Sequence, residues 1–380
     1  MNKAVLEQDL EKRKEMINFG IGRPSADLLP LDLMHQACEA FFREAEPYDI
    51  SYGRKEGDPR FTESLAAFLE LNYGKQVEAD SFFLSGGVSQ ALDFICTQLS
   101  QPGDIIIVEE PCYFLAYQIF KDHGLNIVTV PMDEEGMNLD ALETLLSKVK
   151  PTLVYTIPSY QNPSGVSMTA ERRERLIALS QSHDFLIVAD EVYQLLSYHG
   201  SPPSAFGTML IGDTVLSVGS FSKILAPGLR LGWIQTSKKL VQQLTKAGLP
   251  NSGGNINQFT SMIVKQALDS GMAQKHLEKL RTVYSDRVNT MDATLREQLS
   301  DYVSWTKPKG GYFFWLKLIK PVDLKVLQER ASSLQVQFHS GTLFSNKEEL
   351  QDYIRLSFAY YGQESIRSGI ARLKTAFMSG

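Results

Sequence analysis

The chain has 380 residues, too many for one small domain, and its 43% hydrophobic and 22% charged residues are typical of a folded globular protein. The 38 Lys and Arg do not exceed the 44 Asp and Glu, which argues against a nucleic-acid partner. The apolar runs are too short for a membrane span, the charged first sixteen residues are unlike a secretory signal, and Cys38, Cys96 and Cys112 form no CxxC pair, so we expect a cytoplasmic protein without a membrane partner.

Short apolar runs bounded by turns alternate with helical patterns between about residues 80 and 240. Strands are predicted at Ile105–Glu109, Ile127–Pro131, Leu153–Ile157, Phe185–Asp190, Val215–Gly219 and Gly232–Thr236. Helices are predicted at Ser89–Leu99, Tyr113–His123, Leu139–Lys148 and Thr169–His183. This alternation predicts an α/β fold with a mostly parallel central sheet between helices. Ligands bind such sheets beyond the carboxyl ends of the strands, so we look for chemistry there.

The pattern changes after Pro250. A Gly-rich turn is predicted at 252–254, followed by a helical stretch and a long helix from Met272 to about Leu299. Strands at Tyr312–Leu318 and Tyr353–Phe358 and helices at Leu324–Ser332 and Glu364–Phe377 are expected to follow. We therefore predict a large α/β domain over residues 45–260 and a smaller α+β domain made of residues 1–44 and 261–380.

The sharpest chemical signal is the run Ser220-Phe221-Ser222-Lys223, with Arg230 seven residues later. Hydroxyl groups near a guanidinium suit a phosphate, whose oxygens arginine can hold bidentately. A lysine beside a bound, phosphate-bearing aldehyde can form a Schiff base. A surface loop with a solvated lysine explains this run equally well when it is taken alone.

The run resembles the pyridoxal-phosphate lysine motif of fold-type I enzymes, specifically the class I/II aminotransferases. The resemblance extends from about Ile17 to Ala376. Within the family, the sequence is most similar to the branch that contains 2-aminoadipate, kynurenine and aromatic aminotransferases. It implies a fold-type I transferase whose cofactor, pyridoxal 5′-phosphate, is bound to Lys223 as an internal aldimine. The six histidines show no metal-ligand spacing, so no metal is predicted.

The resemblance gives cofactor roles to residues at strand ends and helix starts. Asp190 is implied to pair with the pyridine nitrogen, while Tyr193 and Asn162 are implied to bind the phenolic oxygen of the ring. Tyr113 matches the aromatic residue that stacks on the ring. The phosphate site is implied to comprise Gly87, Val88, Ser89, Ser220, Ser222 and Arg230. Taken singly, each also has a structural explanation: a strand-ending Asp, a turn-forming Asn, a core Tyr.

Substrate and partner roles follow from the same resemblance. Arg355 lies in the apolar run Tyr353–Phe358 and matches the arginine that holds the substrate carboxylate, although an ion pair or an outward-facing side chain also fits the alternation. Gly22 and Arg23, with Asn162, belong to the implied substrate site, where Arg23 could meet an acidic side chain or simply face water. Tyr52 matches a tyrosine that reaches the cofactor phosphate of the neighbouring subunit, which implies a homodimer.

We therefore predict an aminotransferase in which Lys223, Asp190 and Tyr193 are catalytic. It would move an amino group from an L-α-amino acid to a 2-oxo acid, expected to be 2-oxoglutarate, by a ping-pong mechanism. The alternatives are another pyridoxal-phosphate reaction, such as β-elimination or oxidation, and a non-catalytic binding protein. The sequence departs from the family at 252–255, 339–341 and Tyr312, near the expected substrate pocket, so the amino donor is left open.

Overall fold

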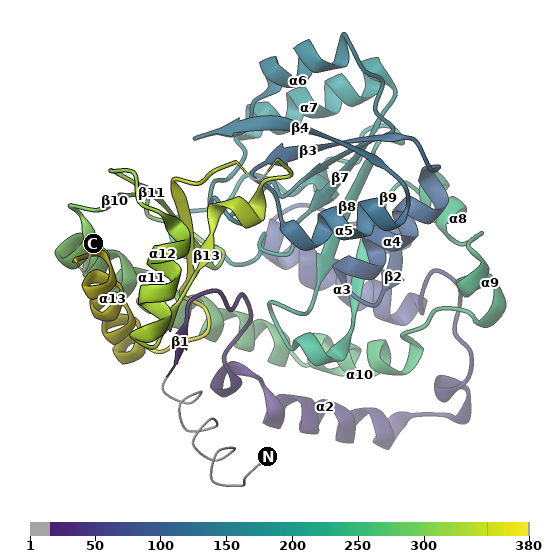
Figure 1. Ribbon diagram of the computed structural model, residues 1–380. Coiled ribbons are helices and arrows are strands. Elements are labelled where there is room, and N and C mark those ends of the chain that lie inside the picture. Colours follow the sequence, from purple (N-terminus) through teal and green to yellow (C-terminus); the bar gives the residue numbers. More distant parts are fainter. Residues whose placement is uncertain (1–15, 348, 379–380) are drawn as a thin grey trace, which may run out of the picture.

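An eight-stranded sheet forms the centre of the protein, shown in Figure 1 as a computed structural model that describes residues 16–347 and 349–378. The strand order is β2-β9-β8-β7-β6-β3-β4-β5. The strands are β2 (Phe82–Ser85), β3 (Ile105–Glu110), β4 (Asn126–Asp133), β5 (Gly136–Met137), β6 (Leu153–Thr156), β7 (Leu186–Asp190), β8 (Val215–Ser220) and β9 (Gly232–Thr236). Strands β4, β3, β6, β7 and β8 are parallel, whereas β9 runs antiparallel between β8 and β2. The predicted mostly parallel sheet is therefore confirmed.

Helices cover both faces of this sheet because its strands are apolar on both sides. Ile106 and Val108 of β3 belong to one hydrophobic cluster, and the intervening Ile107 belongs to a second cluster on the opposite face. The first face packs against α4 (Val88–Leu99) and α5 (Phe114–Asp122), the second against α6 (Leu139–Leu146) and α7 (Ala170–His183) (Figure 1). The carboxyl ends of the parallel strands are thereby left free for a site.

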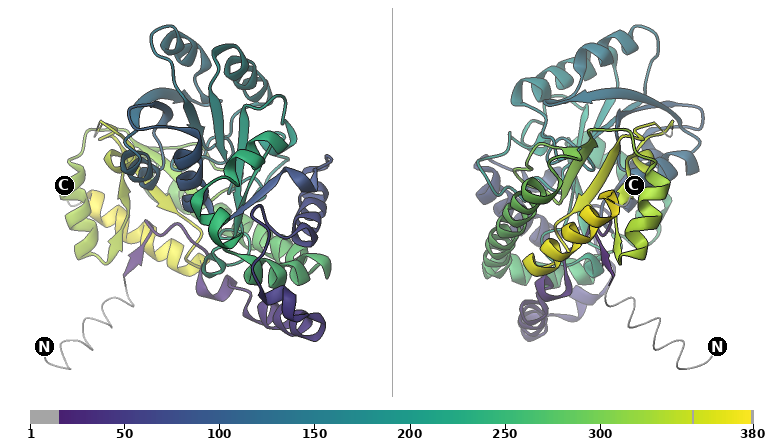
Figure 2. Two further views of the ribbon diagram at one scale, coloured as in Figure 1. Left: turned by 90° about the vertical axis from the view of Figure 1, so that its right-hand side faces the viewer. Right: turned by 60° about the vertical axis from the view of Figure 1, so that its left-hand side comes forward.

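A second, antiparallel sheet lies at one side of the molecule, with the strand order β10-β11-β14-β13 (Figure 2). Its strands are β10 (Val303–Ser304), β11 (Phe313–Leu318), β13 (His339–Ser340) and β14 (Tyr353–Ser357). The helices beside it are α11 (Met272–Leu299), α12 (Leu324–Ser333) and α13 (Gln363–Met378). Strand β1 (Ile17–Asn18) pairs in parallel with β12 (Val336–Gln337). The segment that follows Asn18 then lies between the two sheets, where Gly20–Arg23 line a cavity together with residues of both.

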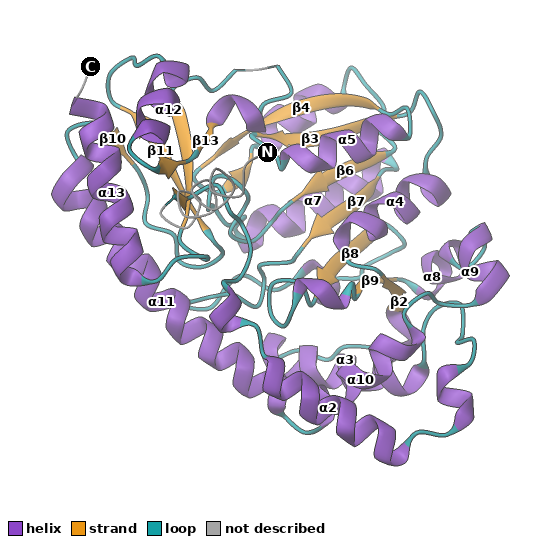
Figure 3. Ribbon diagram, turned by 60° about the horizontal axis from the view of Figure 1, so that its bottom comes forward, coloured by secondary structure: helices purple, strands orange, loops and turns teal. Residues whose placement is uncertain are grey.

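The remaining helices are α2 (Leu31–Glu44), α3 (Pro59–Tyr73), α8 (Lys238–Leu244), α9 (Gly248–Gly253) and α10 (Gln258–Asp269), and Figure 3 shows α2 and α10 beside each other. The prediction of a Gly-rich turn at 252–254 is wrong for Ser252 and Gly253, which are the last residues of α9. The chain turns at Gly254, which has a φ of 73°. Helix α2 ends at one predicted domain boundary and α10 spans the other, and the two helices contact each other, with the Phe41 and Phe259 ring centroids 5.5 Å apart. The domain division stays a prediction. No helix in the described part of the chain is both long and apolar enough to cross a membrane.

Candidate active site

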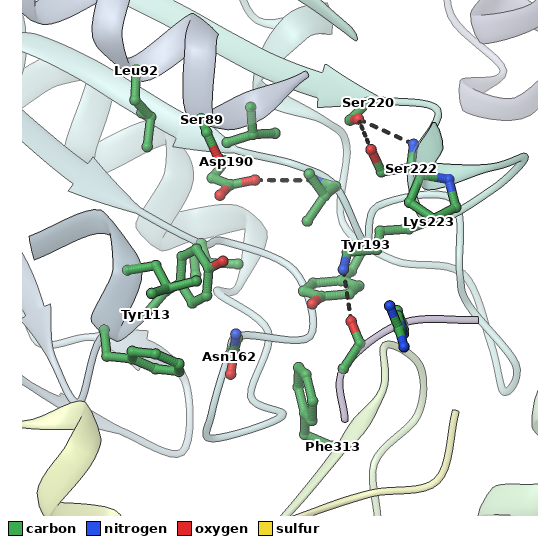
Figure 4. A pocket seen from close by; sticks show the side chains of 18 of the residues that line it. Ser89, Leu92, Tyr113, Asn162, Asp190, Tyr193, Ser220, Ser222, Lys223 and Phe313 are labelled. Atoms are coloured by element: carbon green, nitrogen blue, oxygen red, sulfur yellow. Dashed lines mark hydrogen bonds between the residues drawn. The ribbon is translucent and has the colours of Figure 1, made fainter. Parts of the chain in front are cut away.

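A cavity of about 370 Å³ lies beyond the carboxyl ends of β6, β7 and β8, facing β14 and the segment after β1 (Figure 4). Sequence reasoning predicted thirteen of the residues that line it: Gly22, Arg23, Val88, Ser89, Tyr113, Asn162, Asp190, Tyr193, Ser220, Ser222, Lys223, Arg230 and Arg355. Gly87 directly precedes Val88 at the start of α4. The structure therefore brings together the predicted site residues, with Tyr52 as the exception.

Lys223 follows β8 and projects into this cavity. Its Nζ donates a hydrogen bond to the carbonyl of Gly22 over 2.8 Å, and its own carbonyl accepts one from the Tyr312 hydroxyl over 3.0 Å. Burial lowers the pKa of Lys223 to about 8, although Asp190 favours the charged form. A substantial fraction of the amine is therefore neutral near pH 8, as a nucleophile or proton acceptor requires.

Asp190 ends β7 at the inner wall of the cavity and is only 3% exposed. Its carboxylate accepts hydrogen bonds from the Tyr155 hydroxyl over 2.9 Å and from the amide of Val192 over 3.4 Å. Burial raises the pKa of Asp190 to about 6, because neutral donors compensate the lost hydration incompletely. A cation bound against this carboxylate would restore its ionised form.

A cradle for an anion surrounds the start of α4. Gly87 has a φ of 98°, and a Cβ placed there would lie 3.2 Å from Nη2 of Arg230 and 3.6 Å from Oγ of Ser220. The Ser220 and Ser222 hydroxyls are hydrogen-bonded over 3.0 Å, as Figure 4 shows. A guanidinium, two hydroxyls and the amino end of a twelve-residue helix thus converge, an arrangement that favours phosphate.

Arg355 lies in β14 and is 3% exposed, so the outward-facing alternative is wrong. Its Nη1 donates to Oδ1 of Asn162 over 2.8 Å and its Nη2 to the carbonyl of Gly20 over 2.6 Å. The guanidinium lies 4.1 Å from the ring centroid of Phe313. Burial lowers the pKa of Arg355 to about 10. Within the described residues, Nε is buried without an acceptor, which suits an incoming carboxylate.

The other predicted residues have different surroundings. Tyr113 immediately precedes α5, and both it and the buried Tyr193 line the cavity. Arg23 is exposed at the cavity mouth, with its guanidinium 5.7 Å from the ring centroid of Tyr360. Tyr52 is 82% exposed and lines a separate hollow together with Gly253 and Phe259. Its predicted role requires a second subunit and stays a prediction.

Sequence reasoning missed the residues that hold this site in place. Tyr155 in β6 binds Asp190, and a tyrosine in a fully buried strand needs such a partner, which was the available signal. Glu109 accepts hydrogen bonds from the amide of Ile157 over 3.1 Å and from Gln161 over 3.3 Å, so it anchors the loop that carries Asn162. Burial raises the pKa of Glu109 to about 7.

The chain belongs to the aminotransferase class I and II family, which it matches over residues 14–373. An aromatic-amino-acid aminotransferase of Thermococcus litoralis is 34% identical over 96% of this chain and 88% of its own length. The structure of a kynurenine aminotransferase of Pyrococcus horikoshii, in complex with PMP, has a TM-score of 0.90 at 30% identity and covers 100% of this chain and 95% of that one. An α-aminoadipate aminotransferase of Thermus thermophilus, complexed with N-(5′-phosphopyridoxyl)-L-leucine, has a TM-score of 0.87 at 29% identity, covering 97% and 94%.

This protein is therefore an aminotransferase of fold type I, and its cofactor is pyridoxal 5′-phosphate. The cavity fits that cofactor on its own evidence. A Cβ at Gly87 would narrow the cradle, because it would lie 3.2 Å from Nη2 of Arg230. Among the described residues, the donors to the buried Asp190 carboxylate are neutral. The amine of Lys223 lines the same cavity.

Proposed function

We propose that this enzyme transfers an amino group from an L-α-amino acid to a 2-oxo acid, with 2-oxoglutarate as the acceptor, in a ping-pong reaction. The observation that carries the proposal is one cavity that contains the amine of Lys223, the buried carboxylate of Asp190 and the guanidinium of Arg355, whose Nε has no acceptor among the described residues. These groups suit an amine, a ring cation and a carboxylate, respectively.

Lys223 is the group that moves the proton. When bound, the cofactor supplies an electron sink that stabilises negative charge at the substrate Cα. The neutral Nζ would take the proton from the substrate Cα. It would later deliver that proton to C4′, the cofactor carbon that receives the amino group. The lowered pKa of Lys223, about 8, supports this role because the pKa of a general base works best near the operating pH.

Asp190 keeps the ring nitrogen of the cofactor protonated. Its ionised form is costly in the buried pocket, as the raised pKa of about 6 indicates, so a cation against it is strongly favoured. Gly87, Val88 and Ser89 at the start of α4, with Ser220, Ser222 and Arg230, would hold the phosphate. Tyr113 and Tyr193 line the space between these two anchor points and would hold the ring there.

Arg355 and Asn162 orient the substrate. Their hydrogen bond of 2.8 Å presents the guanidinium from β14 next to the loop after β6, and Phe313 supports it from one side. A carboxylate on this guanidinium would fix the Cα–H bond relative to Nζ of Lys223 and so lower the entropic cost of proton transfer. Gly22 contributes the carbonyl that binds Nζ, and Arg23 at the mouth would meet an acidic side chain.

A homodimer is the proposed active form. Tyr52 lines a hollow together with Ile50, Ile256 and Phe259, and the ring centroids of Phe42 and Phe259 lie 6.0 Å apart. Large exposed side chains in this region comprise Phe42 (64% exposed), Tyr48 (78%), Ile50 (64%), Ile256 (45%) and Phe259 (44%). So many exposed large side chains in one region favour a protein partner. We propose that a second copy covers them and receives Tyr52 at its phosphate. The three free cysteines are in keeping with a reducing cytoplasm.

A subunit-mixing experiment tests the dimer. Lys223→Ala and Tyr52→Ala proteins, each nearly inactive alone, should regain activity after they are mixed, denatured and refolded together, because a mixed dimer contains one intact site. No recovery despite mixed dimers in native mass spectrometry would contradict the contribution of Tyr52 across the interface.

A substrate panel tests the reaction itself. The twenty standard amino acids are offered with 2-oxoglutarate or pyruvate, and the new amino acid and 2-oxo acid are quantified. We expect equal amounts of both products and dependence on the acceptor. Release of ammonia or thiol without an acceptor would contradict transamination and favour an elimination or oxidation.

A further inference from the structure

The cavity has a polar half and an apolar half. Asp190, Ser220, Lys223 and Arg230 belong to the polar half, which accounts for the cofactor. Other lining side chains are apolar, and we call the group of Ile21, Phe114, Leu115, Ile119 and Phe313, together with His339, the apolar half. A substrate whose carboxylate lies on Arg355 must direct its side chain along these residues, because the phosphate and ring groups occupy the polar half.

His339 stands at the boundary of the apolar half. It lies in β13 opposite Arg355 of β14, so its position is fixed relative to the carboxylate-binding group. Its ring centroid lies 6.0 Å from that of Phe114 and 6.2 Å from that of Phe344. A Cβ on Gly20 would lie 2.9 Å from the imidazole, so the ring packs against the backbone of the segment after β1. Packing on three sides holds the imidazole as part of the wall.

A second hollow of about 390 Å³ lies on the far side of this ring. We call it the Asn18 hollow, and its lining comprises Asn18, Lys325, Gln328, Glu329, Ser332, Gln337, Phe338 and His339. Lys325 and Glu329 are exposed, so the hollow opens to solvent beside α12. Among the described residues, His339 alone lines both the cavity and the Asn18 hollow. His339 thus lies between the cavity and a hollow that opens to solvent.

The imidazole is suited to an apolar boundary. Burial lowers the pKa of His339 to about 4, with Arg355 acting in the same direction, so the ring is neutral at physiological pH. Within the described residues, its ring packs against Phe114, Phe344 and the backbone at Gly20. A charged ring there would oppose apolar side chains, whereas a neutral ring packs against them.

We propose that His339 is a specificity-determining residue that sets the greatest length of apolar substrate side chain this site accepts. For substrate side chains short enough to stop before the imidazole, each added methylene buries more apolar surface and raises the affinity about fourfold. Longer side chains collide with the ring, and their affinity falls. This inference rests on the proposed function, because it assumes that Arg355 binds the carboxylate.

Straight-chain carboxylates test the wall without requiring catalysis. Butanoate to nonanoate are titrated into the holoenzyme by isothermal calorimetry, and kcat/KM is measured for L-2-amino acids with the same range of chain lengths. For the wild type we expect affinity to rise with length and then fall. For His339→Ala we expect the fall to disappear and the longest acid to bind about tenfold more tightly than to the wild type, because its chain can enter the Asn18 hollow.

Three variants serve as controls. His339→Ser opens the same wall and replaces the alanine variant should that protein be unstable in thermal melts. His339→Phe keeps a ring in place and should retain the wild-type limit. Lys325→Ala widens the Asn18 hollow from its exposed side without opening the wall, and should also retain the limit.

An unchanged length profile in folded His339→Ala and His339→Ser, or a longer limit in Lys325→Ala, would overturn the role of His339. Failure of the proposed function looks different, because the wild type would then form no transamination product with any chain length in the kinetic series. Carboxylate binding that is insensitive to Arg355→Lys would likewise refute the assumed substrate orientation rather than the wall.

Discussion

Replacing Asp190 with Asn should stabilise the cofactor-free protein. The pKa of Asp190 is raised from an ordinary value of 3.8 to about 6, so the folded state binds this proton more tightly than the unfolded state does. The stability that the protonated carboxyl contributes is therefore present below about pH 4 and is lost as the pH rises through 6. Two pKa units correspond to about 3 kcal/mol of destabilisation at pH 8. Asn can keep both hydrogen bonds, because the hydroxyl of Tyr155 accepts as well as donates.

Thermal melts of the cofactor-free proteins between pH 4 and pH 8 measure this effect. With an unfolding entropy of about 2 cal/mol/K per residue, Asp190→Asn should melt about 4 °C higher than the wild type at pH 8 and at the same temperature near pH 4. Asp184→Asn is the control, because Asp184 follows α7, two residues before the same strand, and its side chain is 93% exposed. A melting temperature for Asp190→Asn that is equal or lower at pH 8 would refute the reasoning.

When both proteins contain the cofactor, the wild type should have a higher melting temperature than Asp190→Asn, the reverse of the order without cofactor. In the proposed wild-type site, the ring cation would meet an ionised Asp190, and loss of one member of a buried charge pair costs about 3–5 kcal/mol. Asp190→Asn should therefore gain less thermal stability from the cofactor, and its amino-acid half-reaction should slow by a factor of about 10² or more. Wild-type half-reaction rates in the variant would contradict the role of Asp190.

Three further predictions concern the other parts of the site. Arg355→Lys should reduce kcat/KM by a factor of about 10² through loss of the guanidinium fork, whereas the exposed Arg367→Lys should change it little; equal effects would count against carboxylate binding. Gly87→Ala should raise the cofactor Kd by about tenfold because its Cβ enters the phosphate cradle, while Gly74→Ala, also at positive φ but in open space, should leave the Kd unchanged in fluorescence titrations. The rate at which the cofactor attaches covalently to the cofactor-free protein should increase as the pH rises towards about 8, because the neutral amine of Lys223 is the reactive form. A rate that is independent of pH in stopped-flow absorbance would contradict the lowered pKa.

Much of the central sheet could be predicted from the sequence because its strands are largely apolar, and helices α6 and α7 begin at side-chain caps. Thr169, for example, caps α7 with its side chain, and the predicted range 169–183 differs from α7 by that residue alone. Short elements were missed, such as β13, because two residues carry no period and their pairing with β14 is decided by tertiary contacts.

The candidate site was predictable where residues follow strand ends in a family pattern, as with Asn162, Asp190 and Lys223. Its supporting residues were not, because Tyr155 and Glu109 act through partners 35 and 48 residues away along the chain. Burial of Arg355 was undecided for a similar reason, since alternation along β14 does not say which face the rest of the protein covers.

Covalent attachment of pyridoxal phosphate to Lys223 is the central claim, and reduction with borohydride tests it most directly. The holoenzyme is reduced, digested and mapped by mass spectrometry. We predict one phosphopyridoxyl group, on the peptide that contains Lys223, and none in the Lys223→Ala protein. A label on another lysine, or a loaded enzyme that carries no label after reduction, would contradict the account.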